Sequence, residues 1–525
     1  MTIKRLVLTF LTLVATLLAA SSLYGSWQEP QFQTRLELYQ TNLALQAQAW
    51  KPADSQDDDS YEGFRQAILG QQPLESATKE YQETRQSVQT NLVKVKNSIA
   101  QLNSVAPTPT PPKPLPEKSP TTEISNSEKQ QQLQQSLEQL QKFLAELDLQ
   151  LGILQAQQGQ TDTALKAWSE LQQRSDIKPE IAQTAAVLSG LWNETPLILP
   201  NAQQLIQQNL DGWFRSTSLT QLYQLQQRQE ALLQVQAAQQ EAATAAVFKL
   251  AVIGTVPTVA ALIGLILIIV LVAQRLLKGK EALLAQNADL TWTTPWDGET
   301  ILQVFVVGFF FMGQVIVPFL LLLLPIPRPI TSVRLQAASV LISYILVALG
   351  ALSVLYVSIK RFFPLPKYWF RFQWLDNWLW WGLGGYCAAL PIVVIVSLIN
   401  QQLWQGQGGS NPLLQLALES QDFVALGIFY LTAAIAAPLF EELLFRGFLL
   451  PSLTRYLSVW GAILISALLF AIAHLSLSEI LPLTALGIVL GVVYTRSRNL
   501  LAPMLLHSLW NSGTLLSLFL LGSSN

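Results

Sequence analysis

The chain has 525 residues, of which 50% are hydrophobic and 13% charged, and its formal net charge is −2. Soluble domains carry about a quarter charged residues, so this composition indicates a membrane protein whose surroundings are the lipid bilayer. The balanced charge excludes nucleic acid as an expected partner, and the single cysteine, Cys387, excludes a disulfide framework and a cysteine-based metal site.

The first predicted element is an apolar run at 6–24, preceded by Lys4 and Arg5. Basic residues before a first span favour a cytoplasmic N-terminus, and we expect residues 1–26 to form a retained signal anchor. The small residues that follow the apolar core leave a cleaved signal peptide as the alternative.

Residues 27–246 are polar and rich in Gln, and Leu and Ala recur at helical spacing over 31–104 and 122–246. A Pro-rich linker at 106–120 separates these two blocks. The offsets within 151–168 resemble one tetratricopeptide unit, but at least three such repeats are normally needed. We therefore expect a Gln-rich helical or coiled-coil region that contacts a protein partner, because no catalytic constellation is present in it.

The second half of the chain holds the long apolar runs. A transmembrane helix needs about 20 such residues. The candidate spans, with the first one included, are 6–24, 248–273, 301–325, 335–357, 378–399, 423–454, 457–475, 480–494 and 500–521. We expect an all-α, polytopic transmembrane helix bundle of about eight or nine spans, with a helical, Gln-rich extramembrane domain near the N-terminus. Within it, 247–369 would link the anchor to a C-terminal bundle at 370–525.

The basic residues between these spans predict the orientation. Strongly basic loops follow the runs 248–273 and 335–357, and the loop 400–422 has neither Lys nor Arg. Alternation from a cytoplasmic N-terminus places the basic loops inside and residues 27–246 on the non-cytoplasmic side. We expect a multi-pass protein of the bacterial inner membrane or another internal membrane.

Ionisable side chains inside a bilayer cost at least about 2.5 kcal/mol each at mid-span, so they mark functional sites. The late spans carry three spaced groups of such residues, which are EELLFR (441–446), FAIAH (470–474) and HSLWN (507–511). Helix rise places Glu441 and His474 at similar depths, and tilted helices would bring His507 and Asn511 within reach, which predicts one polar cluster inside the membrane.

Helix geometry separates the two acidic neighbours. Glu442 and Arg446 are four residues apart and share a face, whereas Glu441 and Arg446 are about 140° apart around the helix. Glu442 is therefore expected to neutralise Arg446, which leaves Glu441 available as a general base. Phe470 shares a face with His474 in the same way, as does His507 with Asn511.

The ordered trio resembles the E-E-x-x-x-R, F-x-x-x-H and H-x-x-x-N/D motifs of the CAAX-protease and bacteriocin-processing membrane proteins, also called the CPBP or Abi family. Ala437-Pro438 beside the first motif is similar to the family pattern as well. The resemblance extends over roughly 370–522, and the chain is similar to type II CAAX prenyl endopeptidases. It implies an intramembrane endopeptidase that hydrolyses a peptide bond in or next to the membrane, in a membrane-associated protein or peptide substrate.

The expected mechanism is attack of water on a peptide carbonyl. Glu441 with His474 would hold and deprotonate the water, and His507 with Asn511 would stabilise the oxyanion. Glu442, Arg446 and Phe470 would support these catalytic residues.

Family members have been described as metalloproteases, and Glu441, His474 and His507 could supply three zinc ligands. The chain has no H-E-x-x-H motif, so we favour an enzyme without a metal cofactor.

Two other classes of function remain open from the sequence. A membrane transporter or channel for an ion or small molecule also uses intramembrane acids and histidines, but no second copy of the trio indicates an inverted repeat. A non-catalytic membrane scaffold would instead act through the Gln-rich region.

Overall fold

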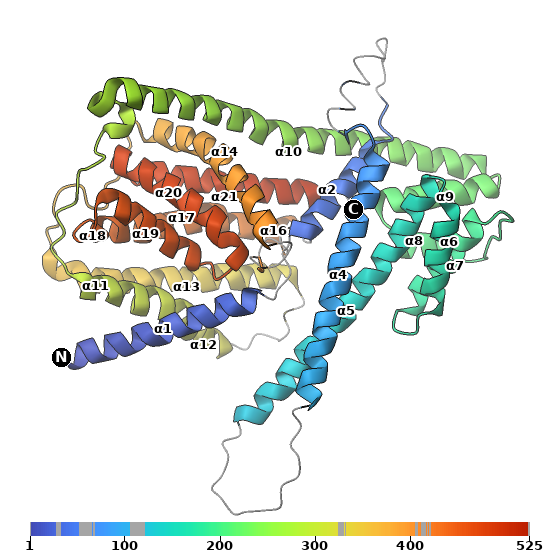
Figure 1. The fold of residues 1–525 in the computed structure, drawn as a ribbon, viewed down its shortest axis with the longest axis horizontal. Helices are drawn as coiled ribbons and strands as arrows, with labels where there is room; N and C mark the ends of the chain where they lie inside the picture. Colours follow the sequence, from blue (N-terminus) through green and yellow to red (C-terminus); the bar gives the residue numbers. More distant parts are fainter. Residues whose placement is uncertain are drawn as a thin grey trace, which may run out of the picture. The chain divides into compact units, whose positions relative to one another are not determined.

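A computed structural model of the chain describes residues 2–522 apart from 28–32, 52–62, 64–65, 67–68, 105–120, 324–329, 331, 405–407, 411–415, 417 and 419–421. Its described residues form helices and no strands (Figure 1). They group into two compact units. The Gln-rich unit is Thr34–Ala251, and the membrane unit combines Met1–Gln33 with Val252–Ser523.

The Gln-rich unit consists of helices packed around one hydrophobic core. Its helices are α2 (Gln33–Ala47), α4 (Pro73–Ser104), α5 (Thr121–Gln157), α6 (Thr161–Gln173), α7 (Pro179–Trp192), α8 (Ala202–Asn209), α9 (Gly212–Leu225) and the first part of α10 (Gln229–Lys278). The predicted Pro-rich linker at 106–120 lies outside the described residues.

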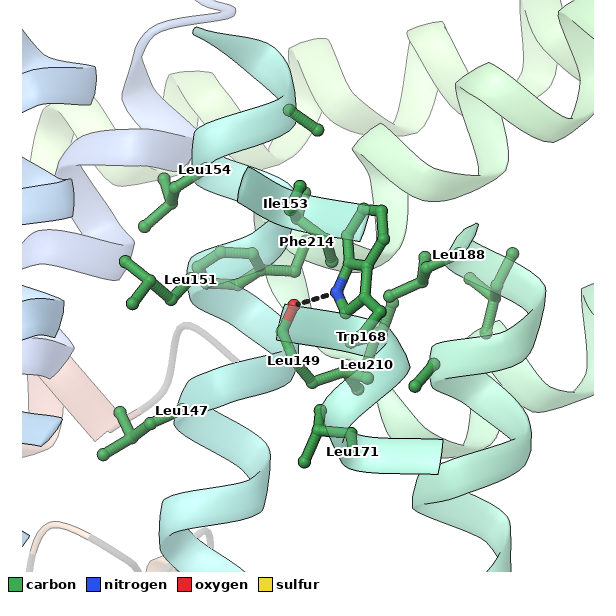
Figure 2. Packing of buried hydrophobic residues seen from close by; sticks show 14 of the residues in the cluster. Leu147, Leu149, Leu151, Ile153, Leu154, Trp168, Leu171, Leu188, Leu210 and Phe214 are labelled. Carbon is green, nitrogen blue, oxygen red and sulfur yellow. Dashed lines mark hydrogen bonds between the residues drawn. The ribbon is translucent and has the colours of Figure 1, made fainter. Parts of the chain in front are cut away.

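The pairing of α5 with α6 shows how this core is built (Figure 2). The Trp168 ring is fully buried against α5, and its Nε1 donates a hydrogen bond of 3.2 Å to the Leu149 carbonyl. A Cβ on Gly152 would lie 2.3 Å from Trp168 Nε1, so only glycine allows this approach. The core draws on seven helices, so the coiled-coil interpretation does not describe this unit.

The membrane unit contains eight helices that are long and apolar enough to cross a bilayer among the described residues, so the protein is a multi-pass integral membrane protein. They are α1 (Ile3–Trp27), α10, α11 with its continuation (Gly298–Leu322), α13 with its end (Val333–Phe362), α14 (Trp378–Trp404), the stretch from α16 (Phe423–Leu453), α20 with its first turn (Leu477–Ser497) and α21 (Leu501–Gly522). Their axes run broadly alongside one another in Figure 1.

One end of the membrane unit, the basic end, is assembled around the loop 279–297. Within that loop, Asn287 Nδ2 donates to the Arg496 carbonyl at 3.0 Å. The Thr294 carbonyl accepts a bond of 3.2 Å from Arg455 Nη1. These contacts bring together basic residues from loops that are far apart in the sequence.

The N-terminal helix α1 connects the basic end to the opposite end of the unit. At its start, Lys4 and Arg5 form ion pairs of 2.9 and 3.0 Å with Glu299, next to the loop 279–297. At its other end, Ser26 Oγ accepts a hydrogen bond of 3.1 Å from the Leu477 backbone nitrogen. The helix is therefore an integral part of the bundle.

The predicted span 457–475 is the one that falls short of a full crossing. Its helix, α19 (Val459–Ile472), has 14 residues, or about 21 Å. It still joins both ends, because Tyr456 before it bonds Gly298 at the basic end and Leu477 after it bonds Ser26 at the opposite end. The helix stops early because the chain turns at Ala473 and His474, which places this histidine at the end of a helix.

Candidate active site

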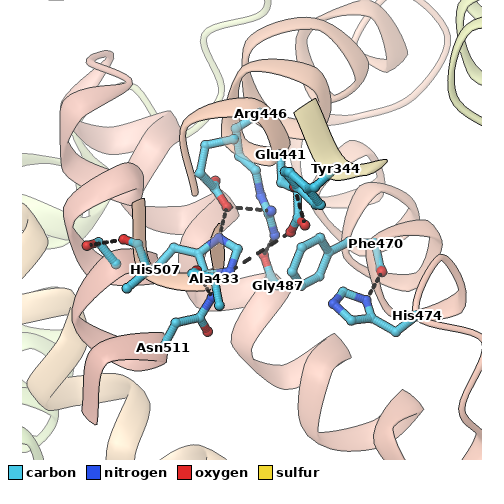
Figure 3. A network of polar contacts seen from close by, with 12 residues as sticks. Tyr344, Ala433, Glu441, Arg446, Phe470, His474, Gly487, His507 and Asn511 are labelled. Carbon is cyan, nitrogen blue, oxygen red and sulfur yellow. Dashed lines mark hydrogen bonds and ion pairs between the residues drawn. The ribbon is translucent and has the colours of Figure 1, made fainter. Parts of the chain in front are cut away.

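The three sequence motifs meet inside the membrane unit, on segments that are neighbours in space (Figure 3). The first motif lies on α17 (Ala437–Glu441) and the π-helical turn after it, Glu442–Leu449. The second motif ends α19, and the third lies on α21. A wider π-helical turn within a helix is often found at functional sites.

Glu442 and Arg446 form the predicted ion pair. Arg446 Nη1 lies 2.9 Å from Glu442 Oε1, and both side chains are fully buried. Their four-residue spacing keeps them together even though the turn is π-helical and not α-helical.

Arg446 also binds two further helices. Its Nη2 donates a hydrogen bond of 3.2 Å to the Gly487 carbonyl on α20, and its Cζ lies 4.4 Å from the centre of the Phe470 ring on α19. A Cβ on Gly487 would come within 2.9 Å of Ala467 and 3.3 Å of Arg446 Nη2. Glycine at this position therefore lets α20 approach closely enough to accept the bond.

His507 lies between the two glutamates, which the sequence did not indicate. Its Nδ1 is 2.9 Å from Glu442 Oε1, and its Nε2 is 4.0 Å from Glu441 Oε2. An ionised carboxylate only accepts hydrogen bonds, so Nδ1 carries the proton and donates it. In the neutral ring, Nε2 is then an acceptor that faces Glu441.

Glu441 is held from a different direction. Tyr344 on α13 (Val333–Ile359) donates a hydrogen bond of 2.9 Å from its hydroxyl to Glu441 Oε1. The Glu441 side chain keeps 16% of its surface exposed, whereas Glu442 has none. Sequence reasoning missed Tyr344, whose signal is only a hydroxyl within an otherwise apolar span.

His474 is placed differently from the expectation that it would act directly beside Glu441. Its Nδ1 lies 2.9 Å from the Phe470 carbonyl, and within the described chain no hydrogen bond or ion pair joins it to Glu441. Phe470 lies between the histidines, with ring centres 5.0 Å from His474 and 5.7 Å from His507. The Phe470 ring therefore packs against both imidazoles and restricts their positions.

Asn511 and Ser508 donate hydrogen bonds to backbone carbonyls of the helix that leads into the first motif. Asn511 Nδ2 donates to the Ala433 carbonyl at 2.7 Å, and Ser508 Oγ donates to the Ala434 carbonyl at 2.6 Å. Pro438 has no N–H, so one helical hydrogen bond to a carbonyl four or five residues before it is missing. The two α21 side chains supply hydrogen bonds to the carbonyls of this turn, and the second N–H of the Asn511 amide remains for other use.

The donor set does not suit a zinc ion. Among the described residues, no three His, Cys, Asp or Glu side chains converge as metal ligands. Glu442 already accepts from Arg446 and His507, and a guanidinium at 2.9 Å would repel a cation held by that carboxylate. The set Glu441, His474 and His507 is also not assembled here, since His474 contacts the Phe470 carbonyl.

Comparisons with known proteins identify relatives of the region that carries the three motifs. Residues 423–513, which include all three motifs, match the family described as type II CAAX prenyl endopeptidase Rce1-like. The chain is 26% identical over 137 residues to the membrane-embedded CAAX protease MroQ of Staphylococcus aureus, covering 25% of this chain and 54% of that protein. It is 28% identical over 132 residues to the Bacillus subtilis membrane protein YdiL, covering 25% and 53%.

A third relative is matched over more of its length. The chain is 31% identical over 145 residues to the UPF0177 protein YxdF of Lactococcus lactis, covering 26% of this chain and 76% of that protein. Against YdiL and MroQ, the chain spans about half of the relative's length. No solved structure matches the chain.

The buried pair predicts a pattern of stabilities. Glu442→Ala and Arg446→Ala should each lower the free energy of unfolding by about 3–5 kcal/mol, because each leaves an uncompensated buried charge. The double variant should recover part of the loss, since no lone charge remains. Melting temperatures of the purified protein in detergent would measure this.

Glu441→Ala provides the matched comparison. It removes the neighbouring carboxylate, which is partly exposed and outside the ion pair, so it should cost far less stability. A strong loss with Glu441→Ala together with a silent Glu442→Ala would mean that the two roles are reversed.

Proposed function

The C-terminal region of this chain belongs to the Rce1-like type II CAAX prenyl endopeptidase family, and from this membership we propose that the protein is an intramembrane endopeptidase. The reaction is hydrolysis of a peptide bond in or next to the membrane. Its substrate is a membrane-associated protein or peptide. The catalytic residues are Glu441, His474, His507 and Asn511.

The gap between Glu441 and His507 supports this proposal more than any other observation. Their facing atoms, Oε2 and Nε2, are 4.0 Å apart, too far for a direct hydrogen bond and suited to one water that contacts both. Both atoms are acceptors, so each accepts a hydrogen bond from one O–H of that water. The lone pairs of the water oxygen then point away from Glu441 and His507. The pair can therefore orient a nucleophilic water, with His507 in the place where the sequence suggested His474.

Each neighbouring contact supports this chemistry. Tyr344 occupies Glu441 Oε1 and directs Oε2 toward His507. Glu442 holds the proton on His507 Nδ1 and stabilises the positive charge that develops if Nε2 gains a proton. The oxygen of the water attacks the carbonyl carbon of the substrate, and Glu441 accepts a proton from that water.

His474 and Asn511 are the hydrogen-bond donors for the oxyanion and the leaving amine of the peptide bond. With Nδ1 bonded to the Phe470 carbonyl, a protonated His474 presents Nε2–H to the oxyanion or to the departing amine. The free N–H of Asn511 is a second donor for the oxyanion. Loss of the C–N bond then gives one carboxylate and one amine.

We infer the orientation from where the basic residues lie. Lys4, Arg5, Arg455 and Arg496 meet at the basic end, which the positive-inside rule places in the cytoplasm. At the opposite end, Arg334 is paired with Asp422. Residues 27–246 lie in the sequence between the first span and the span of α10, so a single crossing by the first span assigns them to the non-cytoplasmic side of a bacterial inner membrane.

Loss of catalysis is expected for Glu441→Gln, His474→Ala and His507→Ala, each with normal accumulation in the membrane. Each variant removes a group that acts on the water, the carbonyl or the leaving amine. Mass spectrometry of membrane proteomes that carry wild type or Glu441→Gln would reveal the precursors that accumulate uncleaved. Near wild-type cleavage by any two of the three variants would contradict the mechanism.

Tyr344→Phe should slow cleavage of such a precursor by about tenfold to a hundredfold, the effect of losing one hydrogen bond to a charged group. The ring stays, so the melting temperature should hardly change. Tyr386→Phe, which removes a hydroxyl from α14 in the same bundle, is the matched control. Equal rates for both variants would remove Tyr344 from the site.

The orientation can be tested by labelling in a Cys387→Ser background. A cysteine at Glu194, an exposed loop position of the Gln-rich unit, should react with an impermeant thiol reagent in intact spheroplasts. A cysteine at Asn287, in the loop 279–297, should react only after lysis. The reverse pattern would overturn the assignment of sides.

A further inference from the structure

The turn that follows His474 has a backbone conformation that needs outside support. Helix α19 ends at Ile472, and Leu475 has a φ of 56°, in the left-handed region. A bulky side chain is disfavoured in that region and persists there only where its surroundings hold it. The chain then passes through the short 3₁₀ turn Leu477–Glu479 into α20. The position of His474 at the helix end therefore depends on what holds the residues just after it.

The His474 ring itself gives little support across helices. Its Nδ1 contacts the carbonyl of Phe470, one turn back along the chain, at 2.9 Å, and the Phe470 ring lies beside it (Figure 3). Among the described residues, no hydrogen bond or ion pair joins the His474 side chain to another helix. The direction in which its Nε2 points is therefore set by the backbone of α19 and of the turn.

Ser26, near the end of α1, fastens this turn to the segment at Gly408. Its Oγ accepts a hydrogen bond from the Leu477 backbone nitrogen at 3.1 Å and donates one to the Gly408 carbonyl at 2.6 Å. The same carbonyl accepts from the Ser478 backbone nitrogen at 3.0 Å. Ser26 is only 6% exposed, so little water competes for these bonds. One hydroxyl thus joins three parts of the chain that are far apart in the sequence.

Two further features show how closely this contact is built. A Cβ on Gly408 would lie 3.0 Å from the Ser478 backbone nitrogen, and the Gly408 φ of 107° is one that favours glycine. From α14, Asn400 Nδ2 donates a hydrogen bond of 2.6 Å to the Ser478 carbonyl. The backbone of Ser478 is therefore held on both sides, and Ser26 holds the residue before it.

We propose that Ser26 is a positioning residue for His474, because it fixes the turn three residues beyond that histidine. This inference rests on the proposed function, in which His474 donates to the oxyanion or to the leaving amine. The segment that matches the endopeptidase family, 423–513, does not include Ser26 or any other part of α1. The first helix thereby contributes to the geometry of the reaction centre in addition to crossing the membrane.

The test uses the fact that the chain has two histidines. NMR of the full-length protein in detergent, labelled with ¹³C at histidine Cε1, gives one signal from each, and His474→Ala identifies the His474 signal. Ser26→Ala should move that signal toward its position in the unfolded protein, because a freed turn lets the imidazole leave the Phe470 ring. The His507 signal should stay in place, which shows that the bundle has kept its fold.

Ser22→Ala is the matched control. Ser22 lies one turn before Ser26 on the same helix, and its side chain is exposed. This variant should leave both histidine signals unchanged. An unchanged His474 signal in Ser26→Ala would overturn the inference, and so would equal shifts of both histidine signals or an equal shift in the control.

A second arm separates this inference from the proposed function. Ser26→Ala should slow cleavage of the precursors that accumulate with Glu441→Gln by about tenfold, as expected for one lost hydrogen bond. Wild-type cleavage by Ser26→Ala together with a displaced His474 signal would overturn the link to the reaction. If wild type and Glu441→Gln show the same precursors, the proposed function fails, and the NMR signals still decide whether Ser26 positions His474.

Discussion

The membrane site depends on one buried charge being neutralised. A guanidinium with no exposed surface in a lipid environment is tolerated only with a partner, and Glu442 supplies that partner at 2.9 Å. The same Glu442 oxygen accepts from His507, and the same guanidinium reaches the Gly487 carbonyl on α20 and the Phe470 ring on α19. One ion pair therefore sets the rotation of the helices around it, and the facing atoms of Glu441 and His507 are positioned as a result.

The second constraint is the need to satisfy every backbone group inside the bilayer. Pro438, three residues before Glu441, has no N–H, so one helical hydrogen bond to a carbonyl of the preceding turn is missing. Ser508 and Asn511 provide substitutes from α21, which fastens that helix to the one carrying the acidic motif. Asn511 has two roles, because its hydrogen bond to the Ala433 carbonyl near Pro438 also holds its amide one helical turn from His507.

The sequence predicted the all-helical membrane architecture, the cluster and the Glu442–Arg446 pair, because each depends on composition or on spacing within one helix. Contacts between helices were harder to predict, since they depend on how each helix is rotated about its axis. For that reason the sequence did not indicate that His507 faces both glutamates or that Tyr344 holds Glu441. The placement of His474 also differed, because helix α19 ends two residues before it and the ring turns to the Phe470 carbonyl.

The hydrogen bond between Ser26 and Leu477 has a consequence for biosynthesis. Its partners are 451 residues apart, and Leu477 lies three residues after His474. At about 5–20 residues per second, the first helix waits roughly 20 to 90 s in the bilayer before the ribosome delivers the loop that it supports. His507 and Asn511 emerge later still. A nascent chain therefore lacks the complete polar cluster until the third motif has been synthesised.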